Sequence, residues 1–300
     1  MMSTLKVSII TLTYKNWHLL GKAIASVVSQ NVDINYTLEY LIVDDGTEGF
    51  DPRFFINILN ETGLDYKIIK NSCNVGTVAS FNNAIQHSNG DIIIPLSADD
   101  EFYDSNVVNN IVNEFVGTDS DIITCLRVPV KNGVEKSSLP KEKHFSLFNN
   151  SNLLLKRILV FGNIISGAST YYRRDVFNKV DLFDTDYRLL EDYPFYIKSL
   201  SLGVKISLLK IKAVNYGVDG VTGSGCINSI IKNDFNNLYR VILNRSDINW
   251  LERRVIMYLK LMSREDRRRC PWREIDVFIV KLILNVRLKY SRAYDFFCKK

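Results

Sequence analysis

The sequence contains few of the residues that mark metal-bound or disulfide-linked folds. Its five cysteines are scattered and odd in number, and no two of them form a C-x-x-C pair. Neither a zinc site nor a disulfide framework is therefore indicated. The three histidines share no spacing, so we expect them on the surface or in ordinary packing. This cysteine usage fits a reducing compartment, and we expect a cytoplasmic protein.

The chain also lacks a long apolar run. No stretch reaches the roughly 18 to 20 consecutive apolar residues that a transmembrane helix needs. Residues 1–14 faintly resemble a signal peptide, but they contain no small-residue cleavage site, and a first buried strand explains them better. Aromatic residues are plentiful while glycine and proline are modest, which argues against a disordered chain. The 300 residues suffice for one large core, with or without a smaller appendage.

Positive charge is concentrated at the carboxyl-terminal end. Residues 251–300 contain fourteen Lys and Arg against six Asp and Glu, a net +8, whereas the whole chain carries only +5. Basic side chains beside Trp and Phe are typical of a helix that lies on anionic lipid. Alternatively, these helices pack on the rest of the protein and expose a solvated basic face. No nucleic-acid motif accompanies the charge, so we expect no nucleic-acid partner.

The first 125 residues alternate short apolar runs with helical patterns, which predicts βαβ units. The runs are apolar throughout, as in strands covered by helices on both faces. We therefore predict an α/β fold with a doubly wound, mostly parallel sheet, followed by a helical extension over residues 226–300. Residues 127–160 are polar and lysine-rich, and we expect an exposed, irregular loop there. The expected strands are residues 7–11, 40–43, 66–69, 92–96 and 121–126.

Polar clusters follow three of the predicted strands: residues 13–16 (TYKN), 44–47 (DDGT) and 97–100 (SADD). In an open α/β sheet, ligands bind beyond the carboxyl ends of the strands, so these clusters are expected to converge. Adjacent carboxylates suit Mg²⁺ or Mn²⁺, which takes few protein ligands and completes its coordination with phosphate oxygens and water. Alternatively, Asp99-Asp100 caps the following helix, and the DDGT segment is only a turn.

Four segments of the sequence, taken together, resemble a known family. The segments SIITLTYKN, LEYLIVDDGT, NVGTVASFNNAI and IIIPLSADD stand in the order found in the nucleotide-binding half of family 2 glycosyltransferases. The match is close over residues 5–105 and continues more loosely to VNYGVDGVTGS. The resemblance implies a GT-A fold over residues 1–225, with a nucleotide-binding half at 1–126 and an acceptor half at 127–225. Residues 226–300 would be a basic helical extension.

The resemblance also implies the residues of the donor site. Asp45 would bind the nucleotide base, with Asp44 beside it. Asp100 would be the principal ligand of Mn²⁺ or Mg²⁺, and Asp99 would be shared between metal and ribose. The full set implied for nucleotide-sugar binding is Leu12, Thr13, Tyr14, Asp44, Asp45, Asn74, Gly76, Asn82 and Asp99.

Three positions depart from the family pattern. The first Asp of its D-x-D motif is Ser97 or Ala98 here, and Lys15 stands where an asparagine is usual. Phe81 occupies the place of an arginine often found before the helix asparagine. Without that arginine, neutralisation of the diphosphate would depend more on the metal or on Lys15.

The catalytic base is implied by the LLEDYPFY segment. Family members use an Asp at the start of a helix to take the proton of the acceptor hydroxyl, and Asp192 matches that position. A base opposite the leaving diphosphate means in-line attack and inversion. Glu191 is predicted to share this work or to orient the acceptor, and these two roles stay open. The alternative reading of Asp192 is a simple helix cap.

We therefore expect an inverting, metal-dependent transferase that moves a sugar from a UDP-sugar to a glycan or polyprenyl-diphosphate-linked acceptor. Bacterial surface polysaccharide such as O-antigen or capsule is the expected product. Residues 226–300 are expected to make peripheral contact with the inner face of the plasma membrane. Two alternatives remain: a catalytically inactive nucleotide-sugar binder, and a nucleotidyltransferase. The second would need a glycine-rich phosphate loop after the first strand, which TLTYKNW lacks.

Overall fold

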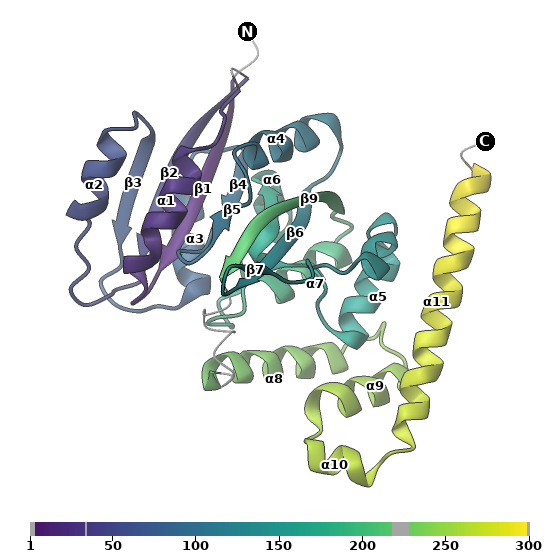
Figure 1. The fold of residues 1–300 in the computed structure, drawn as a ribbon. Coiled ribbons are helices and arrows are strands. Elements are labelled where there is room, and N and C mark those ends of the chain that lie inside the picture. The colour runs from purple at the N-terminus through teal and green to yellow at the C-terminus, as the bar shows by residue number, and fades with distance from the viewer. Residues whose placement is uncertain (1–3, 34, 218–227, 299–300) are drawn as a thin grey trace.

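The computed structural model describes residues 4–33, 35–217 and 228–298. In these residues, nine strands form one mixed sheet in the order β3-β2-β1-β4-β8-β6-β9-β5, with β7 paired to β6 (Figure 1). β1 to β4 run parallel, whereas β8 is antiparallel to both of its neighbours. The strands are β1 Leu5–Thr13, β2 Tyr36–Asp44, β3 Asp65–Lys70, β4 Ile92–Pro95, β5 Glu101–Phe102, β6 Ile122–Lys131, β7 Val134–Glu135, β8 Thr170–Arg173 and β9 Ile206–Gly217.

Helices cover both faces of this sheet, as the continuous apolar strands predict. Neighbouring residues of one strand enter different cores: Ile9 packs with α1, α2 and α4, while Ile10 packs with α3, α5, α6 and α7. The doubly wound α/β prediction is confirmed. The helices on the sheet are α1 Leu20–Val28, α2 Arg53–Asn60, α3 Thr77–His87, α4 Val107–Gly117, α5 Ser151–Phe161, α6 Asp175–Val180 and α7 Asp192–Ser201, with short 3₁₀ turns η1 Trp17–Leu19, η2 Glu142–Asn149 and η3 Gly167–Ser169.

The expectation of an irregular loop over residues 127–160 is wrong. β6 continues to Lys131 because β9 pairs with it, for example at Val128 and Asn215. The chain then turns through β7 and η2 into α5, whose N-cap Asn150 accepts a hydrogen bond from the Leu153 amide at 2.9 Å. Leu154 and Ile158 of α5 are fully buried. The polar composition of this segment reflects its outer face and not a lack of structure.

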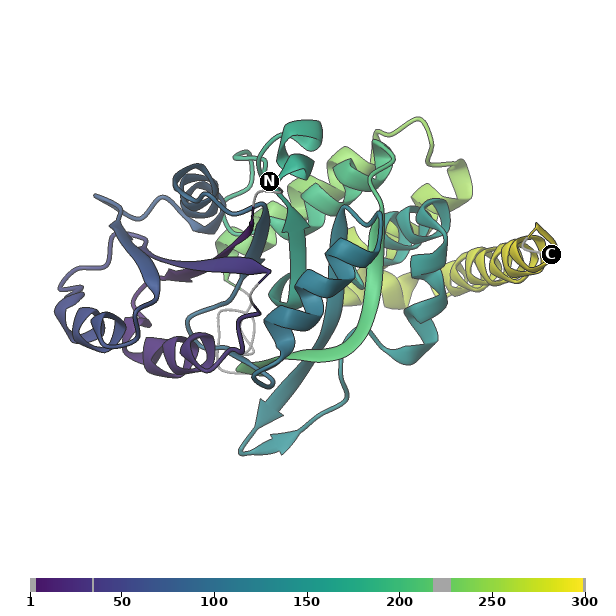
Figure 2. The same cartoon turned by 90° about the horizontal axis from the view of Figure 1, so that it is seen from above.

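The carboxyl-terminal part is helical, as predicted. It comprises α8 Ser229–Leu243, α9 Trp250–Ile256, a π-helical turn η4 Met257–Leu261, α10 Arg264–Arg269 and α11 Arg273–Cys298. Leu238, Val255 and Val277 belong to the same core as α5 and α7, so these helices share the interior of the protein. The far end of α11 projects from the body (Figures 1 and 2). No helix in the described ranges is long and apolar enough to cross a bilayer.

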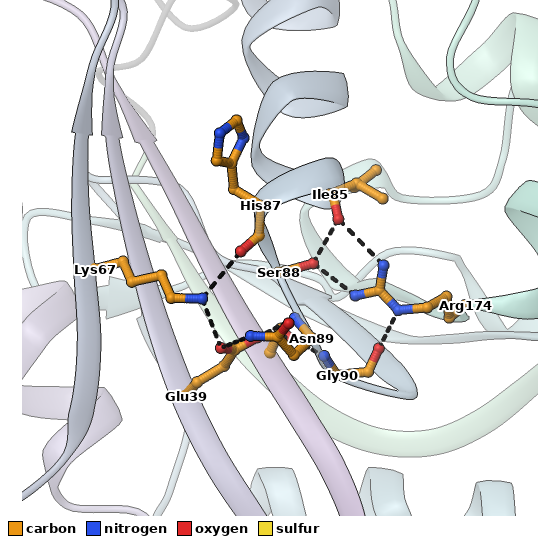
Figure 3. Close-up of polar contacts among 9 residues, drawn as sticks. Glu39, Lys67, Ile85, His87, Ser88, Asn89, Gly90 and Arg174 are labelled. Atoms are coloured by element: carbon orange, nitrogen blue, oxygen red, sulfur yellow. Dashed lines mark hydrogen bonds and ion pairs between the residues drawn. The ribbon is translucent and has the colours of Figure 1, made fainter.

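A polar cluster around the buried Glu39 joins the segments where β1 and β4 begin (Figure 3). The Glu39 carboxylate accepts hydrogen bonds from the Ser8 hydroxyl and the Asn89 amide, both at 2.5 Å, and Lys67 lies 3.5 Å away. The Arg174 guanidinium donates to the Gly90 carbonyl at 2.5 Å and to other groups at the end of α3. These contacts fix the carboxyl-terminal end of α3 beside the start of β4. The amino-terminal end of α3 therefore lies near the carboxyl ends of the parallel strands.

Candidate active site

The first wall of the site is the turn after β1. Thr13 is buried and donates a hydrogen bond from its hydroxyl to the Asn16 side chain at 2.8 Å. Lys15 has a positive φ of 62°, and its amide donates to the Thr47 hydroxyl at 2.9 Å. This bend turns Tyr14 outward, with 41% of its surface exposed. A flat aromatic face is thereby presented at the carboxyl end of the sheet, where a nucleoside base could stack on it.

Asp45, after β2, holds the loop that leads into α3. Its Oδ1 accepts hydrogen bonds from the Asn71 side chain and the Val75 amide, at 3.0 and 2.9 Å. Its Oδ2 accepts from the Asn74 side chain and the Gly76 amide, at 2.8 and 2.9 Å. A carboxylate has about four acceptor sites, so these donors use the usual capacity of Asp45. A base imide would therefore have to displace one of them.

The neighbouring Asp44 is fully buried and forms the turn that was one reading of this segment. Its Oδ2 accepts the Thr47 amide at 2.8 Å. The resemblance implied that Asp44 would lie beside the base, and Asp44 is not among the residues that line the cavity described below.

Asp99 and Asp100 follow β4 but do not cap the next helix, which begins at Val107 with Asn106 as its N-cap. The Oδ1 of Asp100 accepts the Gly217 amide at 2.9 Å, and its Oδ2 is buried without a hydrogen-bond partner. Burial and the adjacent Asp99 raise the pKa of Asp100 to about 7. Gly217 is required here, since a Cβ on it would stand 2.7 Å from the Asp99 carbonyl.

The acceptor side is formed by the start of α7. Asp192 is the first residue of the helix, and its Oδ1 accepts the amide of Tyr193 at 2.6 Å. Its Oδ2 accepts a hydrogen bond from the side-chain amide of Asn163 at 3.3 Å. Burial raises the pKa of Asp192, and burial together with the charge of Asp192 raises that of Glu191. The N-cap of α7 is Glu191, which makes no capping hydrogen bond with its side chain. Capping therefore does not account for Glu191, whereas Asp192 does accept one backbone amide of the first turn through Oδ1.

One cavity of about 410 Å³ joins these walls. This is within the usual size range of small-molecule sites. Asp99 lines it from the turn after β4 and Asp192 from the start of α7, so the candidate donor and acceptor sides share one space. Of the predicted residues, those that line the cavity are Leu12, Thr13, Tyr14, Asp45, Asn74, Asp99, Glu191 and Asp192.

Gly76, Asn82 and Asp100, like Asp44, are outside that lining. The side-chain amide of Asn82 donates to the Phe183 carbonyl at 2.8 Å and accepts the Phe183 amide at 3.0 Å. It therefore ties α3 to the segment before α7. Gly76 has a φ of 93° and is the N-cap of α3, which makes its part structural. The contacts of these two residues were not visible from their positions in the motifs.

Comparison with known proteins decides the family. The model of glycosyl transferase family 2 matches residues 8–181, more than half of the chain. The chain belongs to family 2 of the glycosyltransferases. A curated relative, an uncharacterized glycosyltransferase YwdF of Bacillus subtilis, is 25% identical over 200 residues, covering 65% of this chain and 68% of the relative.

Solved structures share the fold of this family 2 glycosyltransferase. TarS of S. aureus, in complex with UDP-GlcNAc, matches with a TM-score of 0.61 at 18% identity over 85% of this chain and 71% of that chain. The mannosyltransferase PcManGT of Pyrobaculum calidifontis, in complex with GDP-Man and Mn²⁺, matches with a TM-score of 0.56 at 16% identity over 78% and 64% of the two chains. The GT-A fold is thus confirmed.

The carboxylates of this glycosyltransferase fit a divalent cation only in part. Among the described residues, no three His, Cys, Asp or Glu side chains gather as a metal cluster. The Asp99-Asp100 pair, with its unsatisfied buried oxygen, suits a metal that receives its remaining ligands from a diphosphate and water. Such a site would be completed by the bound nucleotide.

Sequence reasoning missed Arg188 of the glycosyltransferase. It lines the cavity, and its Nη2 donates to the Asn74 side chain at 2.7 Å and to the Asn74 carbonyl at 3.1 Å. The amides of Arg188 and Leu189 both donate to Oδ2 of Asp234, at 3.1 and 2.8 Å, so α8 holds this segment. The available signal was a cation three residues before the acidic Glu191-Asp192 pair.

Proposed function

We propose that the protein transfers a sugar from a UDP-sugar to a glycan acceptor with inversion at the anomeric carbon. The observation that carries this proposal is the shared cavity: Asp99 lines it on the side of the nucleotide-binding turns, and Asp192 lines it on the other side. The TarS complex with UDP-GlcNAc supports a uridine nucleotide as the donor. Tyr14 and Leu12 would contact the nucleoside.

In the proposed reaction, the acceptor hydroxyl attacks the anomeric carbon as the bond from that carbon to the diphosphate oxygen breaks. The hydroxyl proton passes to the Asp192 carboxylate, and UDP leaves with the bonding electrons. Burial raises the pKa of Asp192, which strengthens it as a base while Asn163 keeps it oriented. Attack opposite the diphosphate inverts the configuration, as in other displacements with oxocarbenium character.

We assign the first contact with the metal and diphosphate to Asp99, with Asp100 behind it. This reverses the order expected from the sequence, because Asp99 lines the cavity and the Oδ1 of Asp100 is occupied by Gly217. A bound Mn²⁺ or Mg²⁺ would offset negative charge on the departing diphosphate. Arg188 would supply the protein cation that the sequence lacks at Phe81.

The proposed acceptor is lipid-linked, such as a polyprenyl-diphosphate glycan of O-antigen or capsule synthesis. Helices α8 to α11 would bring the protein to the inner face of the plasma membrane. The support is the exposed apolar and basic surface of α11, where Phe278 and Leu282 are 66% and 52% exposed.

The test is UDP release from a panel of UDP-sugars with Mn²⁺ and lipid-linked acceptors, beside UDP binding by calorimetry. We expect turnover with at least one donor, and loss of metal-dependent UDP binding in Asp99→Asn. The matched control is Asp104→Asn, which removes an exposed acid just beyond the pair and outside the cavity lining. Tight UDP binding without turnover for any donor would favour the inactive binder, and absence of UDP binding would contradict the proposal.

A further inference from the structure

A second cavity, of about 690 Å³, lies between α5, η2, η4 and α11, apart from the active-site cavity. Five leucines and Phe161 form its apolar wall. Its charged or ionisable lining residues are Lys143, His144, Arg157, Lys260 and Lys281, and no carboxylate is among them. A cavity of this composition is suited to an anion that carries an apolar part.

Three cations of this cavity contact a carbonyl oxygen or aromatic rings and not carboxylates. Arg157 donates through Nη1 to the Gly162 carbonyl at 2.9 Å, and its guanidinium lies 5.4 Å from the Phe161 ring centre. The Lys281 ammonium lies 5.9 Å from the centre of the same ring. Lys260 faces the Tyr239 ring at 5.6 Å. Within the described part of the chain, none of the three forms a salt bridge.

Burial lowers the pKa of both Arg157 and Lys260, and the charge of Arg157 lowers that of Lys260 further. Removing a cation from water without a counter-charge is costly. Over residues 273–291 of α11, where side chains are described, the two acids are used elsewhere: Asp276 pairs with Arg254 at 2.7 Å, and Glu274 accepts the Tyr258 hydroxyl at 3.3 Å. The positive charge in the cavity is therefore left for an external anion.

The same helix presents an apolar surface beside the cavity. Lys281, Leu284, Asn285 and Leu288 recur at helical spacing and line the cavity. The adjoining stripe of α11 is exposed, with Ile275, Phe278 and Leu282 at 60%, 66% and 52%. A ligand with its charge in the cavity would thus meet apolar side chains both on the wall and along the rim.

We propose that this cavity binds the phosphate headgroup of an anionic lipid, with the lipid chain against the leucine wall and the apolar stripe of α11. Arg157, Lys260 and Lys281 contact the phosphate. A lipid is favoured over a protein surface because Arg157 and Lys260 are half-buried among apolar side chains, where a small anionic headgroup can reach them, with Lys281 at the rim. The inference rests on the proposed membrane contact of residues 226–300 and is independent of sugar transfer.

The second cavity lies next to the segment that positions Asp192 in the active site. Gly162, whose carbonyl is held by Arg157, precedes Asn163, which contacts Asp192. A Cβ on Gly162 would stand 2.5 Å from the Lys260 ammonium nitrogen, so this lysine is packed against the same turn. Lipid held here would place the membrane surface on the acceptor side of the enzyme.

The experiment is co-sedimentation of the full chain with phosphatidylcholine vesicles, with and without phosphatidylglycerol. We expect binding only to the anionic vesicles, weakened about fivefold in Lys281→Gln and in Lys260→Gln. Arg287→Gln is the matched control, since Arg287 stands on α11 outside the cavity lining. Lys281 is exposed on its helix, so Lys281→Gln keeps the test valid even where Lys260→Gln fails to fold.

Three results would overturn the proposal. Equal loss in Lys281→Gln and Arg287→Gln would mean general attraction to a charged surface and not a site. Equal affinity for inorganic phosphate and for short-chain phosphatidylglycerol in calorimetry would mean a free-phosphate site. A dimer that Phe278→Ser dissociates, with no vesicle binding, would mean that a second copy covers α11. UDP binding, measured in parallel, reports on the donor site separately, so failure of either proposal is recognised.

Discussion

The Asp192 carboxylate lies directly over Gly167: a Cβ added at residue 167 would stand 2.8 Å from Oδ2 and 3.2 Å from the carboxyl carbon. Such distances are below normal contact, so residue 167 must lack a side chain for Asp192 to keep its place. The small residue is thus explained by the acid that it faces and not by a left-handed backbone, since Gly167 has no positive φ.

From this contact we expect Gly167→Ala to displace Asp192 and to lower the turnover number by about a hundredfold, because misplacing a reacting group by about 1 Å has that effect. UDP affinity should stay unchanged, as the nucleotide side of the cavity is untouched. The control is Gly117→Ala, where a Cβ would meet nothing within 4 Å. If Gly167→Ala keeps the full turnover number in a UDP-release assay, the close approach of Gly167 to Asp192 is not needed for activity.

The Arg188 side chain is expected to bind the nucleotide. Replacing it with Gln should weaken UDP binding by about tenfold or more, the loss typical of a hydrogen bond to a charged group. Gly76→Ala should weaken UDP binding similarly, because a Cβ there would stand 2.5 Å from Cγ of Arg188. Calorimetry with UDP measures both, and Arg245→Gln serves as a control outside the cavity lining. Unchanged affinity in Arg188→Gln would remove this residue from the donor site.

The Glu39 cluster predicts a dependence of stability on pH. Burial works to raise the pKa of Glu39, but hydrogen bonds from Asn89 and Ser8 outweigh it, so the pKa is lowered from 4.5. A lowered carboxyl pKa stabilises the folded state above about pH 4.5, and this contribution is lost as the pH falls through the folded-state value.

We therefore expect Glu39→Gln to lower the free energy of unfolding by about 1–3 kcal/mol at neutral pH. The difference from the unaltered protein should shrink as the pH falls below 4.5 and through the lowered folded-state pKa of Glu39. Urea unfolding at neutral pH and at successively lower acidic pH values measures this difference. An equal difference at all of these pH values would show that the charge of Glu39 has no part in the effect.

The sequence predicted the parts of the fold that depend on local pattern. Apolar strands such as β4 and their alternation with helices gave the doubly wound sheet, and the convergence of residues 13, 45 and 99 followed from strand direction alone. Residues 127–160 could not be predicted, because β6 is extended by β9 from about 85 positions later. A polar composition does not reveal pairing with a partner so distant in the chain.

The roles of individual acids were less predictable for the same reason. Whether Asp99 or Asp100 faces the cavity depends on the Gly217 amide, which β9 brings from the far end of the sheet. The Asp45 carboxylate is occupied by a loop that returns to it, and Arg188 enters through a segment anchored by Asp234 of α8. Motif order indicates which residues gather in the site, whereas long-range contacts decide which atoms remain available.

The measurement that tests the account most directly is a comparison of transfer and UDP binding in Asp192→Asn. Asparagine fills the same space but cannot accept the hydroxyl proton, so we predict that transfer falls by at least a hundredfold while calorimetric UDP affinity is retained. Asp186→Asn, which alters an exposed acid of the same segment, should leave both unchanged. Transfer at the unaltered rate in Asp192→Asn would contradict the assignment of the base and with it the proposed inverting mechanism.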